Sequence, residues 1–363
     1  MPDRLYWLAW QLLLPGSAAR VWSLVSNWGS LKDAWYAKDS DLANVLRLKS
    51  PAAKRLLERR ANIDIKREYD QLVSMGIEFI CYHDAKYPQS LRTIFDPPPG
   101  IFVRGELRET APGAALVGSR KSTAYGRKVA GQLGYDLARA GVTVVSGMAR
   151  GVDTAAHEGA VRAGGYTVAV LGCGVDVVYP PENKIIMQQI IDCGAVISEF
   201  PPQSAPEAWH FPVRNRVISG LSRCIVVVEA AERSGALITA DVALEQSRDV
   251  LAVPGNISSR MSKGSNGLIK QGAKLVESAA DILEEMGLYT LFPVEDDTSD
   301  TMVGIKLSPD ENKIFNILCS EPMHLDEIIK RSGSNPGEVL SLLMYLEIKG
   351  AIKQLPGKMF VQE

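Results

Sequence analysis

The sequence has no long apolar run, and this absence argues against a membrane protein. A helix that spans a bilayer needs roughly 20 apolar residues, whereas the longest apolar runs, at residues 167–171 and 225–228, have the length of strands. The apolar stretch at residues 5–14 follows Asp3 and Arg4, whose charges cancel, so it is more typical of a helix than of a signal peptide. We therefore expect no membrane contact.

Cysteine is scarce, and a strong net charge is absent. The five cysteines, Cys81, Cys173, Cys193, Cys224 and Cys319, include no C-x-x-C pair. Such an odd, scattered set favours a reducing, cytoplasmic compartment and argues against a zinc site. Because the net charge is −2, a nucleic-acid partner cannot be inferred from global charge and would need a local basic cluster.

The glycine-rich motifs of nucleotide-dependent enzymes are also lacking. A dinucleotide fold carries G-x-G-x-x-G after its first strand and an acidic residue at the end of its second strand. Here the first turn, at residues 118–122, lacks the second glycine, and the second strand ends in Ser146 and Gly147. No Walker lysine motif occurs. NAD and ATP chemistry are poorly supported, and we expect no cofactor and no metal.

The sequence does contain a repeated alternation of strands and helices. The candidate strands are continuous runs of Val, Ile, Leu and Ala, as buried parallel strands should be; they lie at residues 114–118, 142–146, 167–171, 195–198, 224–229 and 250–253. Amphipathic helices lie between them, for example at residues 125–140. The alternation predicts an α/β fold with a doubly wound, Rossmann-like, mostly parallel sheet.

Differences in composition and in hydrophobic pattern divide the chain into four segments. Residues 1–72 contain short helices around a Leu-Pro-Gly turn, which predicts an N-terminal helical module, either SAM-like or helix-hairpin-helix-like or a plain packing module. Residues 73–290 form the Rossmann-like domain, and residues 291–306 form an acidic linker. Residues 307–363 contain three helices and a hairpin with a Pro-Gly turn, which predicts a winged helix.

Glycine and arginine gather in the loops that should follow the strands. Ligands of an open parallel sheet bind at the carboxyl ends of its strands, where this sequence places Arg120, Arg150 and Arg233. Glycine lets the backbone approach a ligand, and helix N-termini offer free N–H groups to an anion. Turn glycines are usual in such folds, but arginines in three separate loops favour anion binding.

Residues 209–216 interleave aromatic side chains with arginines. Aromatic faces can stack on bases while arginines hold phosphates, which is the chemistry of single-strand binding. Alternatively, Phe211 is a core residue and the arginines lie on a solvated helix face. The segment alone favours neither interpretation.

Seven motifs resemble those of the DprA/Smf family of DNA-processing proteins. They follow one another in the family's order at residues 118–120, 146–157, 198–201, 211–216, 228–230, 234–240 and 253–255, within residues 75–285. One departure is Ala236, where the family usually has a hydroxyl residue, although the turn should survive. The resemblance implies a homodimer that binds single-stranded DNA and helps to load the RecA recombinase during natural transformation.

The same resemblance implies a set of DNA contacts. Ser119 and Arg120 would contact phosphate, and Phe211 would stack on a base or line a pocket. Arg214 and Arg216 would contact the backbone or support that pocket. The full expected set is Gly118, Ser119, Arg120, Lys121, Gly147, Arg150, Phe211, Arg214, Asn215, Arg216, Ser234, Gly235, Thr239, Lys263 and Asn266, with Gly264 in a loop that would close over the strand.

No catalytic constellation stands out, so we expect a protein that is not an enzyme. Asp153 and His157 lie four residues apart on one expected helix and would face the same side. They could form an acid–base pair, but we favour an acid placed at the helix N-terminus and a histidine that stabilises the fold. Glu199 and Glu229 end two strands, and no nucleophile or metal-binding residue accompanies them in the sequence.

Two other functions are alternatives. Phosphoribohydrolases of the lysine-decarboxylase-like type carry a carboxylate where this sequence has Val242, which makes hydrolysis of nucleoside monophosphates the second hypothesis. A winged helix that reads duplex DNA presents several basic or amide side chains on its third helix, but residues 336–349 offer only Lys349 as a cation. A protein-contact or autoregulatory role fits this helix better, while Lys353 and Lys358 leave the question open.

Overall fold

The computed structural model describes residues 3–108, 111–288, 308–318, 322–355 and 357–362. The chain divides into two units, Met1–Val294 and Glu295–Glu363. The expected acidic linker at residues 291–306 lies outside the described residues.

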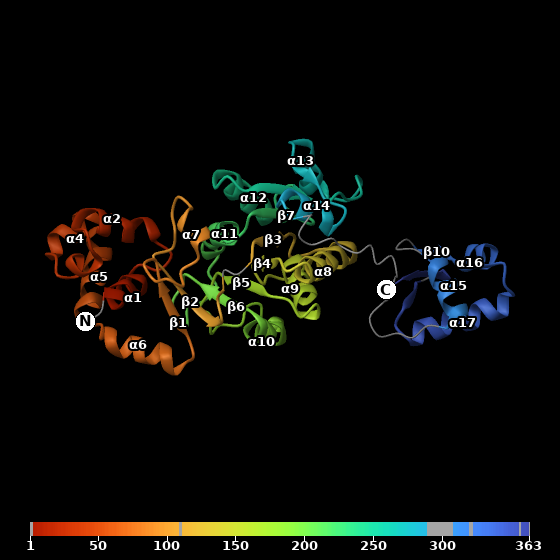
Figure 1. Ribbon diagram of the computed structural model, residues 1–363, viewed down its shortest axis with the longest axis horizontal. Coiled ribbons are helices and arrows are strands. Elements are labelled where there is room, and N and C mark those ends of the chain that lie inside the picture. The colour runs from red at the N-terminus through yellow and green to blue at the C-terminus, as the bar shows by residue number, and fades with distance from the viewer. Residues whose placement is uncertain (1–2, 109–110, 289–307, 319–321, 356, 363) are drawn as a thin grey trace. The chain divides into compact units, whose positions relative to one another are not determined.

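A nine-stranded sheet forms the centre of the first unit (Figure 1). Its strand order is β1-β2-β6-β5-β4-β3-β7-β8-β9. The strands are β1 Glu78–Cys81, β2 Gly100–Gly105, β3 Gly113–Val117, β4 Thr143–Ser146, β5 Thr167–Leu171, β6 Ala195–Ser198, β7 Cys224–Val227, β8 Asp249–Ala252 and β9 Lys274–Leu275. Strands β3 to β9 run parallel to one another, and β1 and β2 add an antiparallel edge beside β6. The doubly wound, mostly parallel α/β fold is confirmed.

Helices cover both faces of this sheet because its central strands are buried on both sides. One face packs on α8 Ala124–Arg139, α9 Val152–Arg162, α10 Lys184–Cys193 and α14 Ala279–Glu285. The other packs on α7 Gln89–Arg92, α11 His210–Gly220, α12 Gly235–Glu245 and α13 Lys263–Lys270. The short 3-10 helix η1 Pro181–Asn183 precedes α10. Within the described ranges, no helix is both long enough and apolar enough to cross a membrane.

Six helices precede the sheet and share its core. They are α1 Asp3–Leu13, α2 Ala18–Trp28, α3 Leu31–Trp35, α4 Asp39–Val45, α5 Ser50–Asn62 and α6 Ile65–Ser74. Trp7 and Trp10 of α1 belong to one apolar cluster with Phe79, Phe102 and Leu171 of the sheet. The boundary expected near residue 72 therefore falls inside one unit, because the N-terminal helices bury their apolar faces against the strands beyond it.

The second unit has the three helices and the hairpin that the sequence predicts. It contains α15 Pro309–Ile317, β10 Met323–His324, α16 Leu325–Ser332, α17 Pro336–Ile348, β11 Ile352–Leu355 and β12 Met359–Gln362. The strands form a three-stranded sheet in the order β10-β12-β11. Ile328, Val339, Leu343 and Phe360 are among the residues of its own apolar core.

Candidate nucleic-acid interface

The order of the strands places a crevice at the carboxyl ends of two neighbouring strands, β3 and β7. From β3 the chain proceeds through β4, β5 and β6 on one side, and then crosses to β7 on the other side of β3. The loops that leave β3 and β7 therefore diverge, and such a switch point is where open parallel sheets bind ligands. We call the cavity at this place the switch-point pocket.

The switch-point pocket has a volume of about 550 Å³ and brings together ten of the fifteen expected contact residues. The loop after β3 contributes Gly118, Ser119, Arg120 and Lys121; α11 contributes Phe211, Arg214 and Asn215; and the start of α12 contributes Ser234, Gly235 and Thr239. The loop after β3 lies about 90 residues before α11, and α11 in turn precedes the start of α12. Only the topology of the sheet makes them neighbours.

Phe211 lies at the mouth of the pocket with a cation over its ring. The guanidinium carbon of Arg120 is 4.5 Å from the centre of the Phe211 ring, and that of Arg214 is 5.9 Å away. The Tyr179 ring lies 5.8 Å from the same centre. Phe211 is partly exposed and Arg120 is exposed, so the pair offers a flat ring and an accessible positive charge side by side. That arrangement suits a base and its phosphate.

Arg214 supplies a second positive charge from the floor of the pocket. Its side chain is buried, and its guanidinium donates hydrogen bonds to the carbonyl oxygens of Gly147 and Val170 and, from Nε, to Asn215 Oδ1. Burial lowers the pKa of Arg214 to about 10, with Asp153 opposing the shift. The group stays charged at neutral pH, and it connects the ends of β4 and β5 to α11.

Small residues and helix termini complete the pocket wall. A Cβ at Gly118 would lie 2.6 Å from Val152 Cγ2 and 2.9 Å from the Glu229 carbonyl oxygen, so only glycine fits there. Ser234 caps α12 by accepting a hydrogen bond from the Ala236 N–H. The turn at Ala236 survives without a hydroxyl, as expected. The first turn of α12 thus opens toward the pocket with its positive dipole end.

Comparison with known proteins identifies the family of this chain. Residues 78–287 match the family described as DNA recombination-mediator protein A, and residues 300–358 match the DprA winged helix domain. The chain is also 32% identical to protein Smf of Synechocystis over 98% of both chains. This chain belongs to the DprA/Smf family. The expected family and the winged helix are therefore confirmed.

Solved DprA structures resemble the fold described above. The crystal structure of DNA processing protein A from Streptococcus pneumoniae matches with a TM-score of 0.66 and 34% identity, over 78% of this chain and 98% of that one. The Helicobacter pylori protein, studied for its unique mode of binding single-stranded DNA, matches with a TM-score of 0.52 and 26% identity, over 58% of this chain and 95% of that one. DprA of Bacillus subtilis is 42% identical over 58% of this chain and 72% of its own length.

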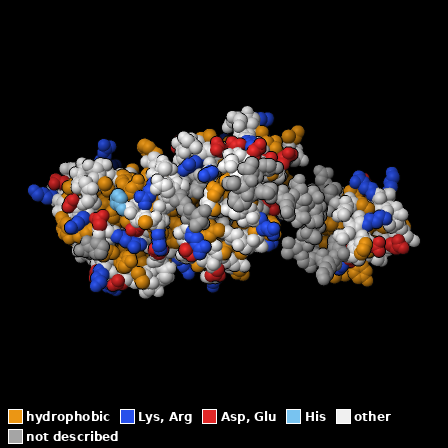
Figure 2. Space-filling view, in the orientation of Figure 1, with side chains coloured by type: hydrophobic (Ala, Val, Ile, Leu, Met, Phe, Trp, Pro, Cys, Tyr) orange, Lys and Arg blue, Asp and Glu red, His pale blue; other side chains and the backbone are white. Residues whose placement is uncertain are grey.

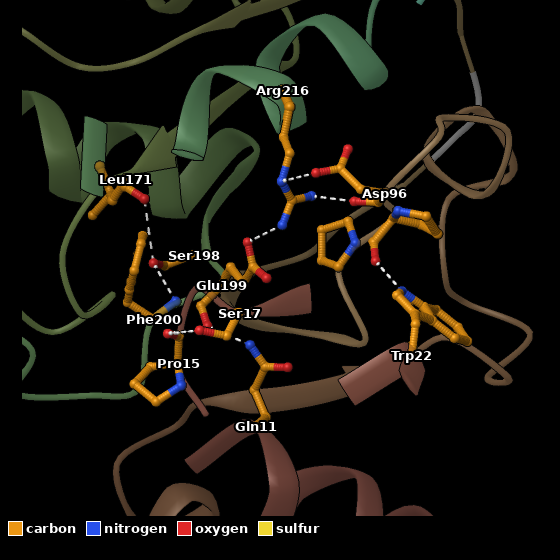
Figure 3. Close-up of polar contacts among 12 residues, drawn as sticks. Gln11, Pro15, Ser17, Trp22, Asp96, Leu171, Ser198, Glu199, Phe200 and Arg216 are labelled. Atoms are coloured by element: carbon orange, nitrogen blue, oxygen red, sulfur yellow. Dashed lines mark hydrogen bonds and ion pairs between the residues drawn. The ribbon is translucent and has the colours of Figure 1, made fainter. Parts of the chain in front are cut away.

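Arg216 lies away from the pocket of this DprA/Smf chain and has a structural role. Its guanidinium forms ion pairs with Glu199 and with Asp96, the latter at 3.1 Å from Nε. Figure 3 shows the guanidinium of Arg216 between these two carboxylates. The Gln11 amide of α1 donates to the Glu199 carbonyl oxygen at 2.7 Å. Arg216 therefore connects α11 to the loop before β2 and to the end of β6. In this buried position Arg216 supports the fold, and it does not line the switch-point pocket.

Four other expected contact residues also lie outside the lining of the pocket. Gly147 is buried below it and accepts from Arg214. Arg150 forms an exposed ion pair with Glu182, and Lys263 lies 3.8 Å from Glu232. The Asn266 amide bonds the backbone of Gly255 at 2.9 and 3.1 Å, which shapes the loop rather than facing a ligand.

The structure adds pocket residues that the sequence argument missed. Pro212, Ile218, Ile238 and Met261 line the switch-point pocket beside Phe211. Pro212 lies inside the motif that carries Phe211, so its position in the sequence was a usable signal. Ile238 likewise lies inside the motif at residues 234–240, whereas Met261 lies in a loop with no distinctive pattern. The place of Met261 at the pocket depends on tertiary packing.

The acidic residues near the carboxyl ends of the strands already have partners within the protein. Asp153 accepts from the N–H groups of Gly147 and Ala149 at 3.2 and 3.4 Å, and burial raises its pKa. His157 contacts Thr167 rather than Asp153, so the two do not form an acid–base pair.

The strand-end glutamates are held in the same way. The buried Glu229 carboxylate accepts from the Thr123 N–H and hydroxyl at 2.8 and 2.9 Å, and Glu199 is bound to Arg216. In the described part of the chain no three His, Cys, Asp or Glu side chains gather as metal ligands would.

Proposed function

We propose that this chain binds single-stranded DNA in the switch-point pocket and, as a cytoplasmic homodimer without catalytic activity, helps to load RecA onto that DNA during natural transformation. The observation that carries the DNA-binding part is the exposed Arg120 guanidinium over the partly exposed Phe211 ring at the switch point of the sheet. A ring stacks on any base, and a guanidinium holds any phosphate. Membership of the DprA/Smf family and the DNA-binding Helicobacter pylori relative support the same function.

The electrostatic setting supports this proposal. Figure 2 shows lysine and arginine side chains scattered among acidic ones on the face in view, and the net charge is −2. Attraction for a polyanion must therefore come from local groups. Arg120 and Lys121 are exposed and have no carboxylate partner among the residues that the structure describes. Their charges are available to phosphate.

Reversing the charge at Arg120 tests the proposal. Arg120→Glu should weaken binding of labelled oligothymidine by at least about tenfold, because a charge-assisted contact contributes roughly 1.5–3 kcal/mol and the new carboxylate repels phosphate. Arg139→Glu, on the exposed end of α8, is the matched control and should bind as the wild type does. Unchanged affinity in Arg120→Glu with a native circular dichroism spectrum would refute the proposal.

The RecA step needs its own assay. The wild type should speed the assembly of RecA filaments on single-stranded DNA covered by a competing single-strand-binding protein, and Arg120→Glu should not. If Arg120→Glu binds DNA poorly and yet speeds assembly fully, the two activities do not share this pocket.

Hydrolysis of nucleoside monophosphates has little support in this geometry. Asp153 is the one carboxylate among the described lining residues of the switch-point pocket, and backbone N–H groups hold it. Val242 lies at a different cavity, beside Arg216. We expect no free base when the purified protein is incubated with nucleoside monophosphates, and chromatographic detection of a base would restore the hydrolase hypothesis.

A further inference from the structure

A second cavity lies at the opposite edge of the sheet from the switch-point pocket. Gly113 and Thr143, which begin β3 and β4, line it together with Val168 of β5, so it opens at the amino ends of the strands. Its volume is about 400 Å³. We call it the amino-edge pocket. No motif discussed above falls in its lining, and the length of the strands separates it from Arg120 and Phe211.

Three arginines line the amino-edge pocket, and no described lining residue is acidic. Arg108 precedes β3, Arg223 lies between α11 and β7, and Arg248 lies between α12 and β8. The remaining lining residues are apolar or uncharged and polar; they are Pro88, Gln89, Ser90, Leu107, Ala111, Pro112, Gly113, Thr143, Val145, Val168, Leu221 and Ser222. Arg108 is exposed and paired with Glu106, so the positive charge that can attract an anion comes mainly from Arg223 and Arg248.

The guanidinium groups of Arg223 and Arg248 have much of their donor capacity unused. Arg223 donates one long bond, 3.3 Å, to the Met286 carbonyl oxygen. Arg248 makes contacts of 3.3 and 3.4 Å with the Ser90 carbonyl oxygen and Thr93 Oγ1, and its buried Nε has no partner among the described residues. A guanidinium has five N–H donors, and a buried donor without an acceptor is costly. A bound anion would supply an acceptor to the buried Nε of Arg248 and would replace water at the exposed guanidinium of Arg223.

The arginines elsewhere in this unit provide a useful contrast. The buried guanidinium groups of Arg214 and Arg216 each make several contacts with protein carbonyl or carboxylate oxygens. Those two side chains are satisfied by the fold alone. Arg223 is exposed and Arg248 is partly exposed, and both make few contacts with protein acceptors while they line a cavity large enough for a ligand.

We propose that the amino-edge pocket binds a phosphate monoester of nucleotide size, such as a nucleoside 5′-monophosphate. Arginine forks bind phosphate oxygens in pairs, and the volume lies within the range of small-molecule sites, roughly 300–1,000 Å³. Apolar walls at Leu107, Pro112 and Leu221 suit the flat face of a base. The phosphate could come from a free nucleotide or from the 5′-phosphorylated end of a DNA strand. The proposal is independent of DNA binding in the switch-point pocket.

Thermal unfolding of the full chain with thymidine 5′-monophosphate tests this proposal. The nucleotide should raise the Tm of the wild type more than thymidine does, because only the nucleotide carries the phosphate. The rise should disappear in the double variant Arg108→Ala/Arg223→Ala and persist in Arg120→Ala and Arg139→Ala. The single variant Arg223→Gln, which keeps a polar side chain, should lose at least about tenfold in affinity by calorimetry. If the double variant fails to fold, the single variant Arg223→Gln still tests the proposal.

Two outcomes would overturn the proposal. One is an equal rise in Tm for the wild type and both arginine variants of the amino-edge pocket. The other is a rise that Arg120→Ala abolishes, since the nucleotide would then occupy the switch-point pocket.

Oligothymidines with a 5′-phosphate or a 5′-hydroxyl identify the source of the phosphate. Tighter binding of the phosphorylated strand that vanishes in Arg223→Gln indicates a strand end. Equal binding of both strands, together with a nucleotide-induced rise in Tm, indicates a free nucleotide.

Discussion

At the scale of single residues, Phe211 combines a partly exposed ring with two neighbouring cations. Arg120 and Arg214 lie 4.5 and 5.9 Å from the ring centre, and Gly172 lies beneath it, where a Cβ would come within 3.1 Å of Phe211 Cδ1. The ring is therefore held by its surroundings before any ligand arrives. A fixed ring loses little entropy when a base stacks on it.

Phe211→Ala should weaken binding of oligothymidine by about 1–3 kcal/mol, the usual contribution of one stacked base. Fluorescence anisotropy at constant salt measures the change. Phe95→Ala is the matched control, because Phe95 is 99% exposed and lies outside the switch-point pocket. Equal affinities for the two variants would show that Phe211 does not stack.

His157 gives a pH dependence that can be measured. Its side chain is fully buried between α9 and the sheet, where Nδ1 lies 2.8 Å from Thr167 Oγ1 and Nε2 has no partner in the described structure. Burial, with help from the positive charge of Arg214, lowers its pKa to about 3. The unfolded chain binds a proton near pH 6.5. The stability that this group contributes is therefore full above pH 6.5 and is lost as the pH falls toward 3.

His157→Gln should remove this dependence. Between pH 7.5 and pH 5.0 the wild type should lose about 2 kcal/mol more unfolding free energy than the variant, since 1.5 pH units below 6.5 correspond to about 1.36 kcal/mol each. Urea unfolding at the two pH values measures this difference. The comparison removes the opposite contributions of Asp153 and Glu199, whose pKa values are raised by burial. Parallel pH profiles would contradict the assignment.

At the scale of the element, α11 holds two arginines with different tasks. Arg214 and Arg216 are two residues apart, and side chains at that spacing point to different sides of a helix. Arg214 turns to the switch-point pocket, while Arg216 turns to Asp96 and Glu199. Only Arg214 of the two lines the switch-point pocket. The shared family motif had assigned them a common role.

A comparison of two arginine–glutamate pairs tests the contribution of the buried Arg216–Glu199 ion pair to stability. Arg216→Met leaves the Glu199 carboxylate buried without its partner and should destabilise the first unit by about 3–5 kcal/mol. Arg150→Met removes an exposed pair with Glu182 and should not measurably change stability. Urea unfolding monitored by tryptophan fluorescence compares the two. Similar midpoints for both variants would mean that the Arg216 pair adds nothing to the fold.

The sequence predicted the parallel strands well, because buried strands are continuous apolar runs. The expected ranges 167–171 and 195–198 coincide with β5 and β6. It did not predict β1 at Glu78–Cys81, whose four residues carry too little pattern. The burial of Arg216 could not be predicted either, since its partners Asp96 and Glu199 lie far away in the sequence and meet it only through the tertiary fold.

At the scale of the whole molecule, the protein has no global attraction for DNA. The net charge is −2, so the proposed binding of DNA would depend on a few contacts at the carboxyl ends of the strands of one sheet. The topology concentrates those contacts, because the loops after β3 and β7 diverge there and α11 and α12 begin beside them. The amino-edge pocket lies at the other ends of the same strands. Two anion sites would thus share one sheet without sharing a residue.

The salt dependence of DNA binding tests the central claim most directly. Each phosphate contact to a single strand contributes about −0.7 to the slope of log K against log salt concentration. The wild type should show a steep negative slope with oligothymidine, and Arg120→Ala should reduce its magnitude by about 0.7 while Arg139→Ala leaves it unchanged. A wild-type affinity insensitive to salt, or an identical slope in Arg120→Ala, would contradict a phosphate contact in the switch-point pocket.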